Sequence, residues 1–254
     1  MKRKIKTFIF VHDQQIILDF IEIKKFNQLK DVTFVFVGKR DSSKVKKLNN
    51  VIVCNDLPCN IEQYPNLTSF TGWYAIWKNN LYLDCDYLNL FEYDINIVKD
   101  FEKVQSDYLD TGILGYIPLS VHDPRYVKIE KFSKEIIESI KKNYGKDIIN
   151  LINSKSSDSI CSVTSNHTFS KKIFEDYMEW VNPLVEDIKN LEMSGHQIER
   201  SISFFYLVKN LKFKVLPGIL EHFRLDSHKT QSINKDKFKN LYSGLLSLYN
   251  RLLR

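Results

Sequence analysis

The chain has 254 residues, 43% hydrophobic and 13% aromatic, which is enough for one large domain with a hydrophobic core. Its 8 glycines and 6 prolines argue against a disordered protein, and no run of about 18 apolar residues predicts a membrane-spanning helix. The net charge of +6 is scattered along the chain. It fits a phosphate-bearing ligand or an anionic membrane face better than a nucleic acid, because no nucleic-acid-binding motif accompanies it.

The first segment has a basic start, but only about five apolar residues precede His12, which is too few for a signal peptide and predicts a strand over residues 5–11. No C-x-x-C spacing occurs among the cysteines, which are Cys54, Cys59, Cys85 and Cys161. We interpret them as reduced thiols, neither a disulfide framework nor a zinc site, and therefore expect a cytoplasmic protein.

A strand–helix–strand–strand order is predicted for the first fifty residues. Apolar residues at helical spacing follow the first strand. Residues 32–38 form a continuous apolar run, typical of a strand buried on both faces, and residues 51–54 form a third strand. An α/β nucleotide-binding half begins in this way. Ligands in open parallel sheets lie beyond the carboxyl ends of the strands, so we expect His12 and Lys39 near a nucleotide pocket. The alternative for Lys39 is an ordinary basic loop.

An aromatic helix is predicted over residues 68–80. Its aromatic side chains fit a base or a sugar, but a helix packed on a sheet needs such residues in any case. Core packing is the better interpretation of Trp73, whereas Lys78 is the better candidate for a polar contact, with Trp77 beside it.

The densest chemical signal lies in residues 81–97, where two acid-x-acid motifs interrupt an apolar run. Acids on a buried strand cost several kcal/mol unless they are paired, exposed or bound to a cation. Strand side chains alternate, so each motif places two carboxylates on one side of the chain, a spacing that suits Mg²⁺ or Mn²⁺. The motifs are Asp84-Cys85-Asp86 and Glu92-Tyr93-Asp94. The alternative interpretation is a hairpin with solvated acids at its turn.

The second half of the chain is predicted to be mainly helical. Helices are expected over residues 132–145, 171–192 and 194–210, with Pro183 breaking or kinking the second. Residues 235–254 form a basic amphipathic pattern that fits docking on the body, on a second subunit or on a membrane surface. Because no repeat or domain boundary is visible, a single domain over residues 1–254 is predicted.

Four residues in this half are candidates to complete a site with the acids. A cation held at residues 92–94 would neutralise a diphosphate leaving group, and His222 is a candidate further ligand, with His228 as its competitor. Glu199, near the start of a largely apolar helix, fits the base that takes a proton from an acceptor hydroxyl. Arg200 beside it fits a phosphate or a neighbouring acid. The alternative for His222 is a surface or helix-capping residue. The alternative for Glu199 and Arg200 is that their charges only favour a helix terminus. Motifs of P-loop, dinucleotide-binding and serine hydrolase proteins are missing.

The order of these segments resembles GT-A-fold glycosyltransferases. The segments are TFIFVHD, the helix with Trp77-Lys78-Asn79, the acid-x-acid strand, the helix with Q-I-E-R, and LPGILEHFRLDSH. The resemblance runs to about residue 231, and it is to the small sugar transferases of bacterial polysaccharide clusters and large DNA viruses. It implies a single-domain GT-A-like (Rossmann-like) α/β fold with a mixed sheet flanked by helices.

The resemblance also implies roles for particular residues. In that family the acid-x-acid motif holds the metal of a nucleotide-sugar donor, and F-E-Y-D fits this place better than D-C-D, with Glu92 where Asp is usual and Asp94 as the stronger ligand. An E-D pair supplies the base of inverting members; here Glu199 is kept and Arg200 replaces the Asp. A late histidine often completes the metal site, which supports His222.

We therefore predict a metal-dependent glycosyltransferase that moves a sugar from a UDP- or GDP-linked donor to a glycan hydroxyl, with Mn²⁺ or Mg²⁺. The metal ligands are Glu92, Asp94 and His222, the base is Glu199, and the nucleotide-side residues are His12, Lys39, Trp77, Lys78 and Arg200. The alternatives are a nucleotidyltransferase on a similar scaffold and a non-catalytic carbohydrate- or partner-binding module. The sequence leaves open the donor, the acceptor, the stereochemistry, the oligomeric state and peripheral membrane contact. If the source is viral, the expected location is the cytoplasm of the host.

Overall fold

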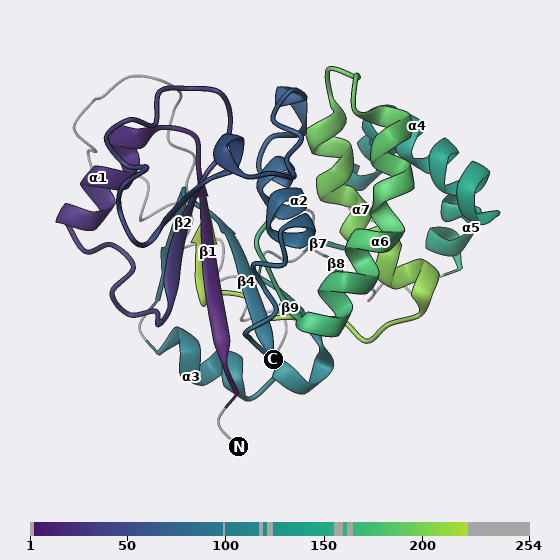
Figure 1. Ribbon diagram of the computed structural model, residues 1–254. Helices are drawn as coiled ribbons and strands as arrows, with labels where there is room; N and C mark the ends of the chain where they lie inside the picture. Colours follow the sequence, from purple (N-terminus) through teal and green to yellow (C-terminus); the bar gives the residue numbers. More distant parts are fainter. Residues whose placement is uncertain are drawn as a thin grey trace.

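A seven-stranded mixed sheet forms the centre of the molecule (Figure 1). The computed structural model describes residues 3–98, 100–116, 119–120, 124–154, 160–161 and 165–222, of which 119–120, 124–132, 160–161 and 221–222 are described by their backbone alone. The strands follow the order β10-β6-β9-β4-β1-β2-β3. Their bounds are β1 Ile5–Val11, β2 Val32–Phe36, β3 Val51–Val53, β4 Tyr87–Glu92, β6 Ile113–Gly115, β9 His167–Ser170 and β10 Lys214–Val215.

Strands β1, β2, β3 and β4 are parallel, and β9 runs antiparallel to both of its neighbours, β4 and β6. Two short antiparallel pairs accompany the main sheet: β5 (Ile95–Ile97) with β11 (Leu220–His222), and β7 (Leu119–Ser120) with β8 (Ile160–Cys161). In Figure 1 β1 rises from the N-terminus at the lower edge, so the carboxyl ends of its parallel neighbours lie at the upper edge.

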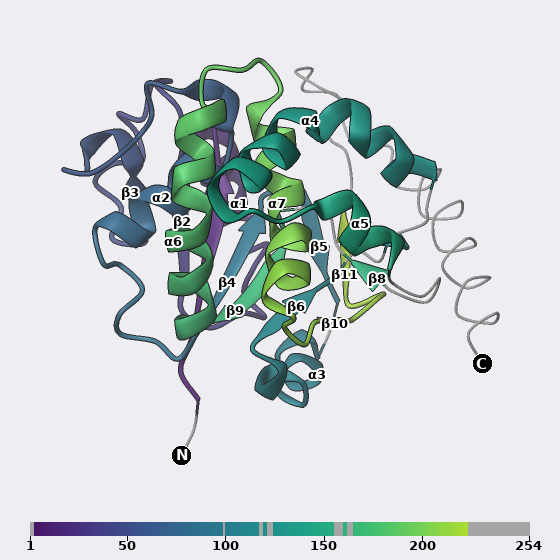
Figure 2. The same cartoon turned by 90° about the vertical axis from the view of Figure 1, so that its right-hand side faces the viewer.

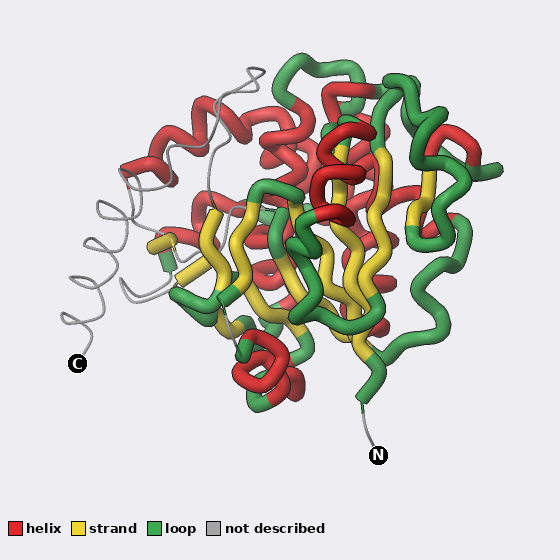
Figure 3. Tube along the Cα trace, turned by 90° about the vertical axis from the view of Figure 1, so that its left-hand side faces the viewer, coloured by secondary structure: helices red, strands yellow, loops and turns green. Residues whose placement is uncertain are grey.

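Helices cover both faces of the sheet. Helices α2, α6 and α7 lie on one face with α4 and α5 outside them, whereas α1 lies over the other face (Figures 1, 2 and 3). The bounds are α1 Gln14–Glu22, α2 Phe70–Lys78, α3 Phe101–Ser106, α4 Pro124–Tyr144, α5 Ile148–Asn153, α6 Lys171–Ile188 and α7 Ser194–Lys209, with 3₁₀ turns η1 Cys54–Asp56, η2 Pro65–Leu67 and η3 Leu109–Thr111.

The central strands are buried on both faces, as their continuous apolar pattern predicted. In β1, Phe8 and Phe10 belong to the core under α2, α6 and α7, and Ile9 and Val11 belong to the core under α1. Alternation along one strand thus supplies both cores.

Two predictions about the helices had different outcomes. A break or a kink was predicted at Pro183, and the break is wrong, since α6 runs from Lys171 to Ile188 through this residue. The proline removes one backbone hydrogen bond, but the buried apolar face of α6 outweighs that loss. The expected stop at Gly145 is confirmed, because this residue has φ of 63° and directly follows Tyr144, the last residue of α4.

Some predictions concern residues outside the described part of the chain, namely His228 and the amphipathic segment 235–254. No helix among the described residues is long and apolar enough to cross a membrane. Cys54, Cys59 and Cys85 are free thiols, as expected.

Candidate functional site

The two acid-x-acid motifs lie at opposite ends of β4. Asp84 and Asp86 precede the strand, whereas Glu92 is its last residue and Asp94 lies in the bend before β5. Because β4 is parallel to β1, only the second motif lies at the carboxyl edge, where Glu92 is in register with Phe10, two residues before His12.

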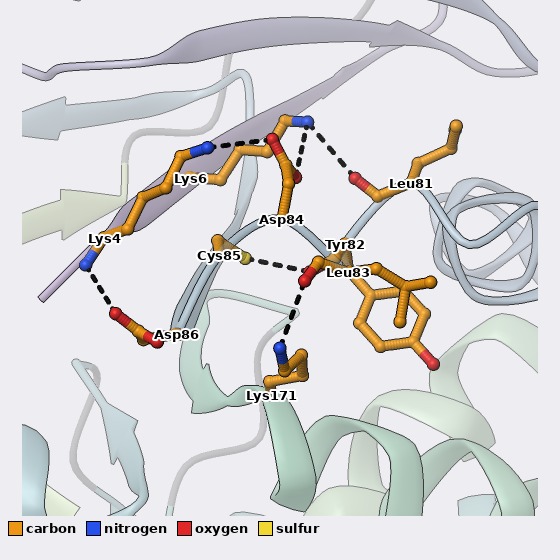
Figure 4. A network of polar contacts seen from close by, with 9 residues as sticks. All are labelled: Lys4, Lys6, Leu81, Tyr82, Leu83, Asp84, Cys85, Asp86 and Lys171. Carbon is orange, nitrogen blue, oxygen red and sulfur yellow. Dashed lines mark hydrogen bonds and ion pairs between the residues drawn. The ribbon is translucent and has the colours of Figure 1, made fainter.

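The first motif joins two strands by ion pairs (Figure 4). Asp84 carboxylate oxygens lie 3.0 Å from Lys4 Nζ and 3.3 Å from Lys6 Nζ. The backbone N–H of Lys4 donates to Asp86 Oδ2 at 2.8 Å. These acids therefore fasten the start of β1 to the segment before β4, away from the carboxyl edge.

Glu92 is surrounded by polar groups from three other elements. The Ser69 hydroxyl, just before α2, donates to Glu92 Oε1. Asn166 Oδ1 accepts from the Glu92 backbone N–H at 2.8 Å. Burial raises the pKa of Glu92 to about 7, and the charges of Glu199 and Asp94 act in the same direction, whereas the hydroxyls of Ser69 and Ser165 oppose them. Three carboxylates thus lie close enough to influence one another.

Glu199 reaches this group from the second turn of α7. Its Oε1 accepts from the Ser165 hydroxyl at 3.3 Å, and its Oε2 lies 3.6 Å from His196 Nδ1. The close approach of α7 depends on Gly195, where a Cβ atom would lie 2.6 Å from the carbonyl oxygen of Asn66. A glycine is therefore required for α7 to reach the loop before α2.

A small pocket lies between the start of α2 and α7. Its lining includes Thr68, Ser69, Ser165, Gly195 and Glu199, with apolar residues such as Trp73. Thr68 has φ 53° and ψ −134°, a conformation that a β-branched residue rarely adopts. A strained backbone at Thr68 and the hydroxyl groups of Ser69 and Ser165 thus lie beside Glu199.

The bend that carries Asp94 is held from the side of α1. Lys25 Nζ donates to the Tyr93 carbonyl oxygen at 3.1 Å, and the Tyr93 ring meets the His12 ring edge to face, with centroids 5.1 Å apart. Burial lowers the pKa of Lys25 to about 8, against the attraction of Asp94. Burial also raises the pKa of Tyr93 to about 12, while Arg40 acts in the opposite direction. Positive and negative groups therefore meet at this bend.

The structure brings together most of the acids predicted for the site. The charges of Asp94 and Glu199 both act on Glu92, and His12 contacts the bend between Glu92 and Asp94 through the Tyr93 ring. The backbone of His222 pairs with Ile95, the residue after Asp94, although its side chain is not among the described groups. This register places position 222 beside the second acid motif.

Other predicted residues lie elsewhere or point to other partners. Trp77 and Lys78 end α2, whereas Ser69 at its start contacts Glu92, and nine residues of helix separate the two ends by about 12 Å. The Arg200 guanidinium donates to the carbonyl of His196 at 3.0 Å. Lys39 is exposed next to Gly38, the last residue of the second predicted strand run.

Sequence reasoning missed Ser69, Ser165, Asn166 and Lys25. Each contacts the acid motif from a distant part of the chain, and no spacing pattern marks such contacts.

The donor atoms at the carboxyl edge fit a hard divalent cation. Carboxylate oxygens are the ligands that Mg²⁺ and Mn²⁺ prefer. Burial raises the pKa of Glu92 most, and the neighbouring charges of Glu199 and Asp94, which a cation would offset, raise it further. Among the residues whose side chains are described, no group of three or more His, Cys, Asp or Glu could hold a metal ion. Position 222, whose side chain is not described, is adjacent to Asp94 through the backbone pairing of His222 with Ile95.

No family model and no curated protein sequence matches the chain. Among solved structures, it is similar to the WbbM bifunctional glycosyltransferase in its apo form, with a TM-score of 0.62 and 17% identity over 86% of this chain and 45% of that chain. The chain thus spans less than half the length of WbbM.

Two further structures show weaker similarity. The galactosyltransferase LgtC, in complex with donor and acceptor sugar analogues, has a TM-score of 0.44 and 10% identity over 95% of both chains. Glucosyl-3-phosphoglycerate synthase from Mycobacterium tuberculosis, in complex with Mn²⁺ and UDP-glucose, has a TM-score of 0.40 and 8% identity over 87% of this chain and 72% of that chain. The mixed seven-stranded sheet with flanking helices and the similarity to WbbM define a GT-A-like glycosyltransferase fold, as the resemblance of the sequence predicted.

Proposed function

We propose that this protein is a metal-dependent glycosyltransferase, which moves a sugar from a nucleoside diphosphate sugar to a hydroxyl group of a glycan. The observation that carries the proposal is the meeting of the Glu92-Tyr93-Asp94 motif with Glu199 at the carboxyl edge of a sheet of this fold. That edge is where ligands bind in open α/β sheets.

In this proposal the acids divide into two roles. Asp94 and Glu92, with His222 beside them, hold Mn²⁺ or Mg²⁺, which when bound supplies charge neutralisation at the leaving diphosphate. Glu199 accepts the proton of the acceptor hydroxyl, and the Ser165 hydroxyl holds its Oε1. Supporting this division, Glu92 is tied to Ser69, whereas one side of Glu199 faces the small pocket.

The nucleotide side of the site lies around the ends of β1 and β2. His12 follows β1 and contacts Tyr93, and Lys39 and Arg40 follow the β2 run, so these groups could bind the base or the diphosphate. We assign no role of this kind to Trp77 and Lys78, because they lie at the far end of α2. Cytoplasmic location and peripheral membrane contact stay predictions from the sequence.

The test is a screen for release of nucleoside diphosphate from UDP- and GDP-linked sugars, with Mn²⁺ or Mg²⁺. With the best donor, Asp94→Ala should reduce turnover by at least about 100-fold, because an essential ligand is lost. Asp84→Asn is the matched control: it changes an acid of the other motif, at the opposite end of β4, and should keep near-normal turnover.

Three results would contradict the proposal. Equal activity of Asp94→Ala and the unaltered protein would remove the metal site from residues 92–94. Release of pyrophosphate in place of nucleoside diphosphate would indicate a nucleotidyltransferase. If no nucleotide with metal raised the melting temperature, a non-catalytic binding module would be favoured.

A further inference from the structure

Lys25 reaches the acid motif from the loop that follows α1. Its ammonium group donates to the Tyr93 carbonyl oxygen at 3.1 Å and lies 4.2 Å from the centroid of the Phe20 ring and 5.4 Å from that of Phe26. The ammonium group is therefore flanked by two aromatic rings and a carbonyl oxygen, which hold the charge at one place.

The carbonyl group that Lys25 binds belongs to the peptide unit that leads into Asp94. The opposite charges of Lys25 and Asp94 attract each other. Because the ammonium is partly removed from water, its field at the bend is screened less than that of an exposed lysine. The bend thus carries a fixed positive charge next to the acid proposed to bind the metal.

We propose that Lys25 is the resident counter-ion of Asp94 and that it makes binding of the divalent cation depend on a nucleoside diphosphate. This inference rests on the proposed function. A bare divalent cation is repelled by the ammonium group, and Asp94 has already been partly neutralised. A cation complexed with a nucleoside diphosphate carries net negative charge, so the same ammonium group attracts it. Lys25 is then a positioning residue that selects the complex over the free ion.

The test measures Mn²⁺ binding by the electron paramagnetic resonance signal of free Mn²⁺, with and without UDP or GDP. Lys25→Gln removes the charge but keeps an N–H donor for the Tyr93 carbonyl, and Lys25→Met removes both. Each should bind bare Mn²⁺ more tightly, on the order of tenfold, and lose most of the enhancement by nucleotide. Lys25→Arg keeps the charge and should resemble the unaltered protein.

Lys24→Gln is the matched control, because Lys24 is the exposed neighbour in the same loop and the substitution removes the same charge from the chain. It should leave both affinities unchanged. Far-ultraviolet circular dichroism verifies that each variant is folded, and Lys25→Gln decides the question if Lys25→Met is not.

The outcomes separate this inference from the proposed function. If nucleotide promotes Mn²⁺ binding to the unaltered protein but Lys25→Gln binds bare Mn²⁺ no more tightly, the role of Lys25 is overturned while the metal site stands. If Mn²⁺ binds to none of the proteins, with or without nucleotide, both proposals are overturned.

Discussion

Glu92 lies in surroundings that oppose its ionisation. Its folded-state pKa of about 7 exceeds the ordinary value of 4.5, chiefly because of burial. Between these values the folded state binds a proton that the unfolded state has released. The resulting contribution to stability is therefore fully present below pH 4.5 and is lost as the pH rises through 7.

We expect Glu92→Gln to raise the free energy of unfolding by about 3 kcal/mol at pH 8 and by almost nothing at pH 4, because the amide is neutral at both values. Urea unfolding at the two pH values measures this difference. An equal increase in the free energy of unfolding at the two pH values would show that ionisation of Glu92 does not destabilise the folded state. The variant should also lose donor turnover, as expected where stability is sacrificed to a function.

His167 in β9 gives the opposite dependence on pH. It is fully buried, lies beside the tilted rings of Phe169 and Phe213, and neither ring nitrogen has a hydrogen-bond partner among the described residues. Burial lowers its pKa from 6.5 to about 3. The contribution of the neutral ring to stability is thus present above pH 6.5 and is lost as the pH falls towards 3.

The chain should therefore lose about 2 kcal/mol of stability through His167 alone between pH 7 and pH 5. His167→Leu should flatten this part of the profile of unfolding free energy against pH, since Leu does not titrate. Comparison with Glu92→Gln over the same range is the control, because that variant removes a contribution of opposite sign. An unchanged slope in His167→Leu would contradict the assignment.

At the scale of elements, the contact of α2 with β1 sets the distance from Ser69 to Glu92. A Cβ atom at Gly72 would lie 2.6 Å from Cδ1 of Phe10 and 2.9 Å from Cγ1 of Val37. Gly72→Ala would gain about 1 kcal/mol of helix propensity but lose about 1–3 kcal/mol by overpacking. The helix must move away from the strand or the Phe10 ring must shift.

We expect Gly72→Ala to lower the melting temperature by several degrees (about 2–4 °C per kcal/mol for a chain of this size) and to reduce donor turnover by displacing Ser69. Thermal unfolding and nucleotide release measure the two effects. Adding Phe10→Leu makes room for the methyl group, so the double variant should recover part of the loss. Strictly additive losses would show that the two residues do not compete for space.

Elements with strong local patterns could be predicted, and contacts between distant segments could not. The apolar run of β2 and the periodicity of α7 identified these elements because burial imposes them locally. Residues 111–120 indicated a strand or a loop without deciding between them, since the place of β6 depends on pairing with β9, more than 50 residues away. The break predicted at Pro183 was wrong for a similar reason, because tertiary packing of α6 outweighs the local effect of the proline.

The candidate site shows the same division. Spacing alone indicated Glu92 and Asp94 as a pair, and the position of Glu199 near a helix start suggested a base. Ser69 and Lys25 contact the motif across gaps of 23 and 68 residues, and their residue types are common on any surface. Such contacts could not be read from one sequence.

At the scale of the whole molecule, the two ends of β4 have separate tasks. The acids at its amino end pair with Lys4 and Lys6, which joins β1 to β4, the pair of strands with the longest register in the sheet. The acids at its carboxyl end meet Glu199. Strand β4 thus has ion-paired acids at its amino end and a second group of acids at its carboxyl end. The fold that contains this strand is similar to that of WbbM.

Strand β11 pairs with β5, the strand that directly follows the acid motif. The ribosome therefore synthesises this partner much later than the motif. His222 is translated 128 residues after Asp94 (222 minus 94). At about 5–20 residues per second the ribosome needs roughly 6 to 26 s for this interval. During this interval the nascent chain already contains strands β1 to β4 but does not yet contain β11. Strand β11 is therefore synthesised only after the strands that carry the acid motif.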